Sequence, residues 1–138
     1  VARFAPGWNV TNCGNAMKPG LATSVRGRSN VLVTHPRDTV TPCTLAKTGD
    51  IPAGKRTNLT VEVSHHERGD WLLSLNIDGQ QKHAPKNISV ATCPEGWQTV
   101  EFDLSDWAGQ TVKLELLNQA TAWNFEAGYW AEITIVSN

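Results

Sequence analysis

Five segments of this chain alternate apolar and polar residues with a period of two. In residues 57–65, TNLTVEVSH, the apolar side chains Leu59, Val61 and Val63 share one face. Successive side chains of a strand point to opposite sides, so this pattern indicates strands that each bury one face. No stretch has a helical period longer than a turn, and we expect an antiparallel β-sandwich of about eight short strands. The alternating segments are 57–65, 71–78, 97–104, 110–118 and 129–136.

Turn residues separate these strands. The Asp78-Gly79 pair favours a tight hairpin, which would place the next strand in residues 80–84. Residues 30–34 and 43–47 are shorter candidate strands on either side of a proline-containing loop. The last segment should direct its side chains to two faces, one with Tyr129, Ala131, Ile133 and Ile135 and the other with Trp130, Glu132 and Thr134.

Length and charge limit the classes of function. A chain of 138 residues is the size of one domain, and we expect a single module over residues 1–138, excised from a larger protein. The formal net charge of -1 provides no basic field for nucleic acid. No stretch reaches the ~20 apolar residues of a membrane helix, and the first residues lack the regions of a signal peptide. We therefore expect neither nucleic-acid binding nor membrane insertion.

The three cysteines, Cys13, Cys43 and Cys93, have no metal-binding or haem-attachment spacing. In an exported protein two of them would form a disulfide, for which we favour Cys13 with Cys43; in a cytosolic protein all three would be buried thiols. Three glycosylation sequons, which begin at Asn9, Asn58 and Asn87, fit an exported protein. We expect export to the periplasm or the extracellular space.

Residues 103–116, DLSDWAGQTVKLEL, combine a capped single turn, a glycine reversal and an immediate strand. This segment resembles the penultimate connection of galactose-binding-like jelly rolls, the fold of many carbohydrate-binding modules. Further segments resemble modules found beside cytochrome or sugar-degrading domains in large exported proteins of planctomycete-type bacteria. They are VLVTHP, PCTL, HERGDWLLSLNIDG, WQTVEFDLSDWAGQTVKLELLN and AGYWAEI, and they span roughly residues 30 to 136. The resemblance implies a jelly roll, a saccharide partner and a fused catalytic or cytochrome domain.

Residues 65–71, HHERGDW, concentrate polar chemistry between two predicted strands. Gly69 and Asp70 suit a connecting turn, and Trp71 should begin the next core-facing row. His65 and His66 point to opposite faces if they lie on a strand, so they do not converge on one metal ion. A single histidine beside a sugar is the more credible role, because neutral imidazole both donates and accepts hydrogen bonds.

Sugar binding requires an exposed aromatic face and polar side chains on a rigid scaffold. The segment QATAWNFEAGYW supplies both in a loop and the following strand, and in the resembling fold this loop lies at one end of the sandwich, where many such modules bind ligands. We predict a non-catalytic carbohydrate-binding module, with its site at this loop first and on a polar sheet face second. The candidate ligand-binding residues are Trp123, Asn124, Glu126, Trp130, His66, Arg68 and Asp70.

Two other functions remain open. A docking domain would pack against a fused enzyme or cytochrome and would expose a large apolar patch. A small hydrolase would need two converging carboxyls, and nothing in the sequence brings a pair together. The resemblance also leaves a structural calcium ion open, and beyond it we expect no cofactor. The candidate donors for calcium are Asp38, Asp50, Asp70 and Glu132.

Overall fold

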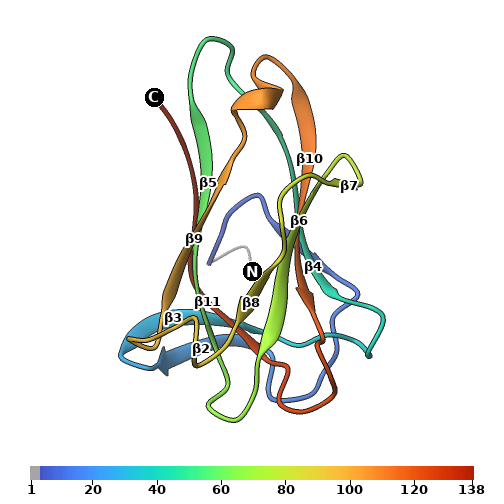
Figure 1. Ribbon diagram of the computed structural model, residues 1–138, viewed down its shortest axis with the longest axis vertical. Coiled ribbons are helices and arrows are strands. Elements are labelled where there is room, and N and C mark those ends of the chain that lie inside the picture. Colours follow the sequence, from blue (N-terminus) through green and yellow to red (C-terminus); the bar gives the residue numbers. More distant parts are fainter. Residues whose placement is uncertain (1–3) are drawn as a thin grey trace.

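The computed structural model describes residues 4–138 and consists of two antiparallel sheets packed face to face (Figure 1). Residues 1–3 of the expected module lie outside the described residues. The prediction of an antiparallel β-sandwich is confirmed. The elements are β1 (Asn9–Thr11), β2 (Gly20–Val25), β3 (Arg28–Thr34), β4 (Cys43–Asp50), β5 (Thr57–His65), β6 (Trp71–Ile77), β7 (Gln80–Gln81), β8 (Lys86–Ile88), β9 (Gln98–Asp103), the 3₁₀ turn η1 (Ser105–Trp107), β10 (Thr111–Gln119) and β11 (Gly128–Ser137).

One sheet has the strand order β1-β4-β10-β6-β7, with β8 also on β6, and the other has the order β2-β3-β11-β5-β9. The four strands β5, β6, β9 and β10 match, to within one residue at each end, the segments whose alternation predicts them. The predicted hairpin is also present, because Asp78 and Gly79 both have positive φ, at 50° and 80°, between β6 and β7.

The core lies between the sheets and is centred on two tryptophans. The rings of Trp71 on β6 and Trp130 on β11 lie 5.2 Å apart, and neither side chain is exposed. Their indole nitrogens are satisfied inside the protein, since Trp71 donates to the carbonyl of Ser64 and Trp130 donates to the hydroxyl of Thr34, each at 2.9 Å. The core position predicted for Trp71 is confirmed.

Strand β11 departs from the sequence pattern. Its pairing with β5 shifts between Trp130 and Glu132, where a β-bulge places one extra residue on β11. The bulge turns Trp130 into the core together with the half-buried Ile133 and Ile135. The expected face shared by Trp130, Glu132 and Thr134 is therefore wrong at Trp130, because strict alternation cannot continue across a bulge.

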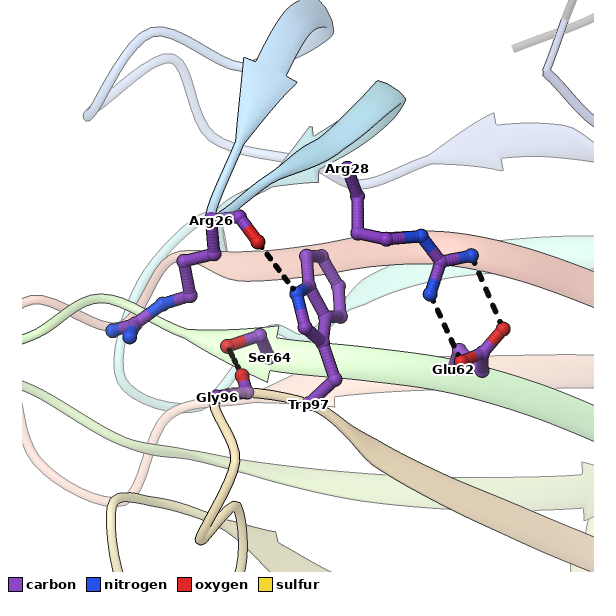
Figure 2. A network of polar contacts seen from close by, with 6 residues as sticks. All are labelled: Arg26, Arg28, Glu62, Ser64, Gly96 and Trp97. Carbon is purple, nitrogen blue, oxygen red and sulfur yellow. Dashed lines mark hydrogen bonds and ion pairs between the residues drawn. The ribbon is translucent and has the colours of Figure 1, made fainter.

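The β2–β3 hairpin crosses the outer face of its own sheet. Strand β3 pairs with β11 only over Gly128–Trp130, and beyond this point the hairpin passes over β11 and β5. Its tip is held by Arg28, whose guanidinium donates two hydrogen bonds to Glu62 at 3.0 and 3.2 Å (Figure 2). Trp97 adds a second anchor, because its indole donates to the Arg26 carbonyl at 3.2 Å and its ring lies 5.6 Å from the Arg28 guanidinium.

A disulfide joins Cys13, just after β1, to Cys43, the first residue of β4. Cys93 is a buried free thiol, and burial raises its pKa. The disulfide fixes the beginning of the loop formed by residues 12–19 at one end of the sandwich. In the described range, 4–138, no helix has the length and apolar character needed to cross a membrane.

Candidate functional site

Three loops meet at one end of the sandwich, at the bottom of Figure 1: residues 12–19, 66–70 and 120–127. We call this region the loop end. Gly69 lets two of the loops touch, because a methyl group at this position would overlap the carbonyl oxygen of Phe125 and lie 2.8 Å from that of Asn124. The sequence suggests a turn role for Gly69, but its φ is not positive, and close packing is what requires a glycine here.

Asp70 ties the loops together. One of its carboxylate oxygens accepts a hydrogen bond from the Thr121 hydroxyl at 2.6 Å, and the other accepts from the Asn87 amide at 2.9 Å. The same Thr121 hydroxyl oxygen lies 3.0 Å from Glu126 Oε1, so its one hydrogen is shared between the two carboxylates. Asp70 thus contributes to the shape of the site by holding the 120–127 loop against its neighbours.

Glu126 organises the same loop from within. Its Oε1 accepts hydrogen bonds from the backbone N–H groups of Thr121 at 2.6 Å and Ala122 at 3.3 Å, in addition to the Thr121 hydroxyl. The side chain is only 1% exposed. The prediction that Glu126 contacts a ligand is wrong for this arrangement, because its carboxylate is turned into the loop that it closes.

Two aromatic side chains project from the 120–127 loop. Trp123 is 48% exposed, and its ring is nearly perpendicular to the His35 ring, at 87°, with a centroid distance of 5.1 Å. Phe125 is 41% exposed and stacks on His66 at 4.7 Å, with the rings inclined by only 14°. These contacts fix both aromatic rings at the surface, as a binding platform requires.

A shallow hollow of about 290 Å³ lies between the 12–19 and 120–127 loops. Phe125 and Met17, which both line it, have left-handed backbone conformations, with φ of 56° and 61°. Such conformations cost roughly 1–2 kcal/mol each for residues other than glycine and cluster at functional sites. The hollow is lined by Ala16, Met17, His35, Trp123, Asn124 and Phe125.

Asn124, His66 and Arg68 have different positions at the loop end. The exposed Asn124 lines the hollow beside Trp123. His66 lies behind Phe125, and its Nδ1 accepts a hydrogen bond from the Arg68 backbone N–H at 3.1 Å. A second hollow of about 290 Å³ lies on the His66 side, where Tyr129 forms part of the wall and burial raises its pKa.

Trp130 is the clearest departure from the predicted site. Its side chain lies in the core and is 0% exposed, so the prediction that it faces a ligand is wrong. The β-bulge after Trp130 is what turns this side chain inward. The polar sheet face proposed as a second site does exist without it. Glu132 lies opposite Glu62 and Thr134 lies opposite Thr60 on β11 and β5.

Four residues that line the hollow are missing from the site predicted from the sequence, namely Ala16, Met17, His35 and Phe125. His35 lies in the proline-containing loop after β3, for which the sequence predicts no binding role. Its Nδ1 lies 2.8 Å from the Pro36 carbonyl, which can only accept, so in the neutral ring Nδ1 carries the proton. No sequence signal brings His35 to Trp123, because 88 residues separate them and only the fold joins them.

Among residues 4–138, no group of three or more histidine, cysteine or acidic side chains is placed to hold a metal ion. Asp38 accepts hydrogen bonds within its own turn, from Val40 and Thr41, and Asp50 accepts one from Thr111. The calcium site implied by the sequence resemblance therefore stays a prediction.

Comparisons with known proteins give the fold a context. The sequence matches no family model and no curated protein sequence. The xylan-binding CBM22-1 domain of Paenibacillus barcinonensis Xyn10C superposes with a TM-score of 0.63 at 12% identity, over 97% of this chain and 87% of that one. A family 35 carbohydrate-binding module from Clostridium thermocellum gives 0.61 at 9% identity, over 95% and 92%.

One structural neighbour is an enzyme. A Stig cyclase from Fischerella sp. TAU has a TM-score of 0.60 at 12% identity, over 96% of this chain and 85% of that one. The fold by itself therefore does not separate binding from catalysis. At these identities the likeness concerns architecture, and the chain has the jelly-roll fold that carbohydrate-binding modules of families 22 and 35 share.

Proposed function

We propose that this chain is a non-catalytic carbohydrate-binding module and that it binds a saccharide at the loop end. The observation that carries the proposal is Trp123, an exposed aromatic ring held beside a hollow by the buried ring of His35. A pyranose ring has an apolar face that packs on such a surface. The carbohydrate-binding modules among the structural neighbours support the same class of ligand.

The polar groups around Trp123 suit hydroxyl recognition. With its proton on Nδ1, the neutral His35 ring has Nε2 available as an acceptor. The Asn124 side chain supplies both a donor and an acceptor next to it. A sugar hydroxyl needs both kinds of partner, so the hollow combines an apolar surface with matched polar groups.

The size of the hollow favours a short ligand segment. Its volume of about 290 Å³ lies near the lower limit of roughly 300 Å³ for small-molecule pockets. We infer that it holds one or two sugar units of an oligosaccharide or polysaccharide. In this proposal the protein is exported, and a fused catalytic or cytochrome domain acts on or near the bound material.

Intrinsic tryptophan fluorescence tests the proposal during titration with plant, algal and microbial polysaccharides. We expect a saturable spectral shift with one class, and loss of that shift in Trp123→Ala. Trp107→Phe is the matched control, because Trp107 follows β9 in the η1 turn and does not belong to the loop end. Repeating the titration with calcium and with a chelator tests the predicted ion independently.

A docking domain is the competing proposal. If the folded protein responds to no saccharide class, and Trp123→Ala behaves like the parent protein throughout, the sugar-binding proposal fails. If Trp123→Ala still binds a saccharide, the proposed class of ligand stands, but the loop end is not the binding site. The polar sheet face around Glu62 and Glu132 would then be the next candidate.

A further inference from the structure

Strand β11 has one incomplete edge. It pairs with β5 over its full length, from Gly128 to Ser137, but it pairs with β3 only over Gly128–Trp130. Beyond the bulge, no described residue forms a strand on that side. In Figure 1 this half of β11 runs up the margin of the molecule to the C-terminus.

The register shows which backbone groups the edge presents. Asn138 and Arg56 exchange two backbone hydrogen bonds, at 2.9 and 3.2 Å. In an antiparallel pair such exchanges recur at every second residue, so Val136, Thr134 and Glu132 also bond to β5. The N–H and C=O groups of the residues between them point to the open side. These residues are Ile133, Ile135 and Ser137.

A crevice of about 630 Å³ adjoins the edge where the β2–β3 hairpin separates from β11. One wall is residues 131–134 of β11, and the other belongs to the hairpin and includes Leu21 and Asn30. Phe4 and the half-buried Ile133 make part of the lining apolar, while Ser29 and Thr134 make another part polar. The crevice therefore has an inner apolar side and an outer polar side, which matches the two faces of a strand.

The outer side is acidic. Glu132 lies directly opposite Glu62, and the Arg28 guanidinium is already paired with Glu62 (Figure 2). The hydrogen bond that Glu132 shares with Glu62 raises its pKa, as expected for two carboxyls that share a site. Glu101 follows in the same sheet, opposite Thr60. A cationic side chain placed here would relieve the repulsion between the carboxylates.

We propose that the open edge of β11 docks an extended segment of a partner polypeptide, whose alternate residues are apolar toward the core and basic toward Glu132. The added strand would pair with Ile133, Ile135 and Ser137 and would complete the sheet by β-augmentation. Unpaired strand edges of this kind readily accept another chain, and residues 133–137 carry neither charge nor proline to prevent it.

The backbone pattern favours a peptide over a saccharide at this place. N–H and C=O groups alternate along the edge in the spacing of a strand, and a second backbone matches all of them at once. The site is also separate from the loop end, because none of the residues lining the crevice lines the hollow at Trp123. The outcome of a peptide-binding test at this edge is therefore independent of whether the loop end binds a sugar.

The test uses the synthetic peptide acetyl-Thr-Val-Lys-Val-Lys-Val-Thr-amide and two N-methylated forms. One form is methylated on the three valines and the other on the two lysines and the last threonine. Only one side of an added strand faces β11, so one methylated peptide should bind like the parent. The other should lose affinity by more than about tenfold, because up to three backbone hydrogen bonds to β11 disappear.

Amide hydrogen exchange provides the readout on the protein. Binding should slow exchange at Ile133, Ile135 and Ser137, while Thr134 and Val136, already bonded to β5, serve as internal controls. Glu132→Gln should weaken the lysine peptide about 2- to 5-fold and leave a threonine-substituted peptide unchanged. The proposal is overturned if the parent peptide does not bind, if both methylated peptides bind equally, or if self-association of the protein alone protects the edge.

Discussion

At the scale of single residues, the environment of each tryptophan decides its role. Trp71 and Trp130 are large core side chains with satisfied indole nitrogens, whereas Trp123 is half exposed. The sequence marks all three as aromatic and suggests the loop position of Trp123. It does not distinguish Trp130, because the neighbouring residues alternate regularly and nothing in them announces the bulge.

Trp71→Ala should lower the free energy of unfolding by about 3–5 kcal/mol, as expected for truncation of a buried tryptophan. Trp123→Ala should change it by less than about 0.5 kcal/mol, because surface substitutions away from special features have small effects. Urea denaturation followed by far-UV circular dichroism measures both values. Equal losses for the two variants would contradict the different roles assigned to the two side chains.

Glu126→Ala should lower the free energy of unfolding by about 1–3 kcal/mol, because the N–H groups of Thr121 and Ala122 would lose their acceptor. Glu126→Gln keeps an oxygen that can accept the same bonds and should retain more stability. The ordering of the two variants in a urea titration checks the role of this side chain. A larger loss in Glu126→Gln than in Glu126→Ala would show that the carboxylate does not organise the loop.

At the scale of elements, alternation predicts strands that have one clear inner face. It identifies β5, β6, β9 and β10, in which the residues that point inward, at every second position, are buried. It misses β2, because this strand is at the edge of its sheet and has no buried residue. Alternation does not predict contacts between loops. The stacking of His66 on Phe125, for example, depends on how two loops that are distant in the sequence fold against each other.

Gly69→Ala should displace the 120–127 loop, because the added methyl group would overlap the carbonyl of Phe125. We expect a loss of about 1–3 kcal/mol of stability, typical of overpacking, together with weaker saccharide binding. Gly49→Ala is a suitable control, because it has open space around its position. Unchanged stability and affinity in Gly69→Ala would mean that the two loops are not packed as described.

The Cys13–Cys43 disulfide closes a loop of 30 residues. The double variant Cys13→Ser, Cys43→Ser should lose about 3–4 kcal/mol of stability, because the unfolded chain regains the entropy that the cross-link removes. A reducing agent should destabilise the parent protein by a similar amount and leave the double variant unchanged. Sensitivity of the double variant to the reducing agent would contradict this assignment, because its remaining cysteine, Cys93, is a free thiol that a reducing agent does not change.

At the scale of the whole molecule, three carboxylates on separate elements link folding to pH. Hydrogen bonds lower the pKa of Asp38 in the 37–42 loop, of Asp103 before the η1 turn and of Glu62 on β5. The donors differ: backbone N–H groups for Asp38, Ser105 for Asp103 and the Arg28 guanidinium for Glu62. All three bonds favour the ionised form of the carboxyl. The folded protein therefore binds these protons more weakly than the unfolded chain does.

A carboxyl whose pKa is lowered by folding stabilises the protein above its ordinary pKa, near 4, and this contribution disappears as the pH falls through the lowered value. Glu132 has the opposite sign, because Glu62 raises its pKa, so it offsets part of the effect. We expect the melting temperature to be nearly constant from pH 7 to 5 and to fall below about pH 4.

Differential scanning calorimetry of the parent and of Glu62→Gln measures this dependence. The variant lacks the ion pair with Arg28, and it should start with a lower melting temperature at pH 7 and lose less on acidification. Because the hairpin tip depends on the same pair, high salt should reduce the difference between the two proteins at pH 7. A melting temperature that rises on acidification would show that the raised pKa of Glu132 outweighs the three lowered ones.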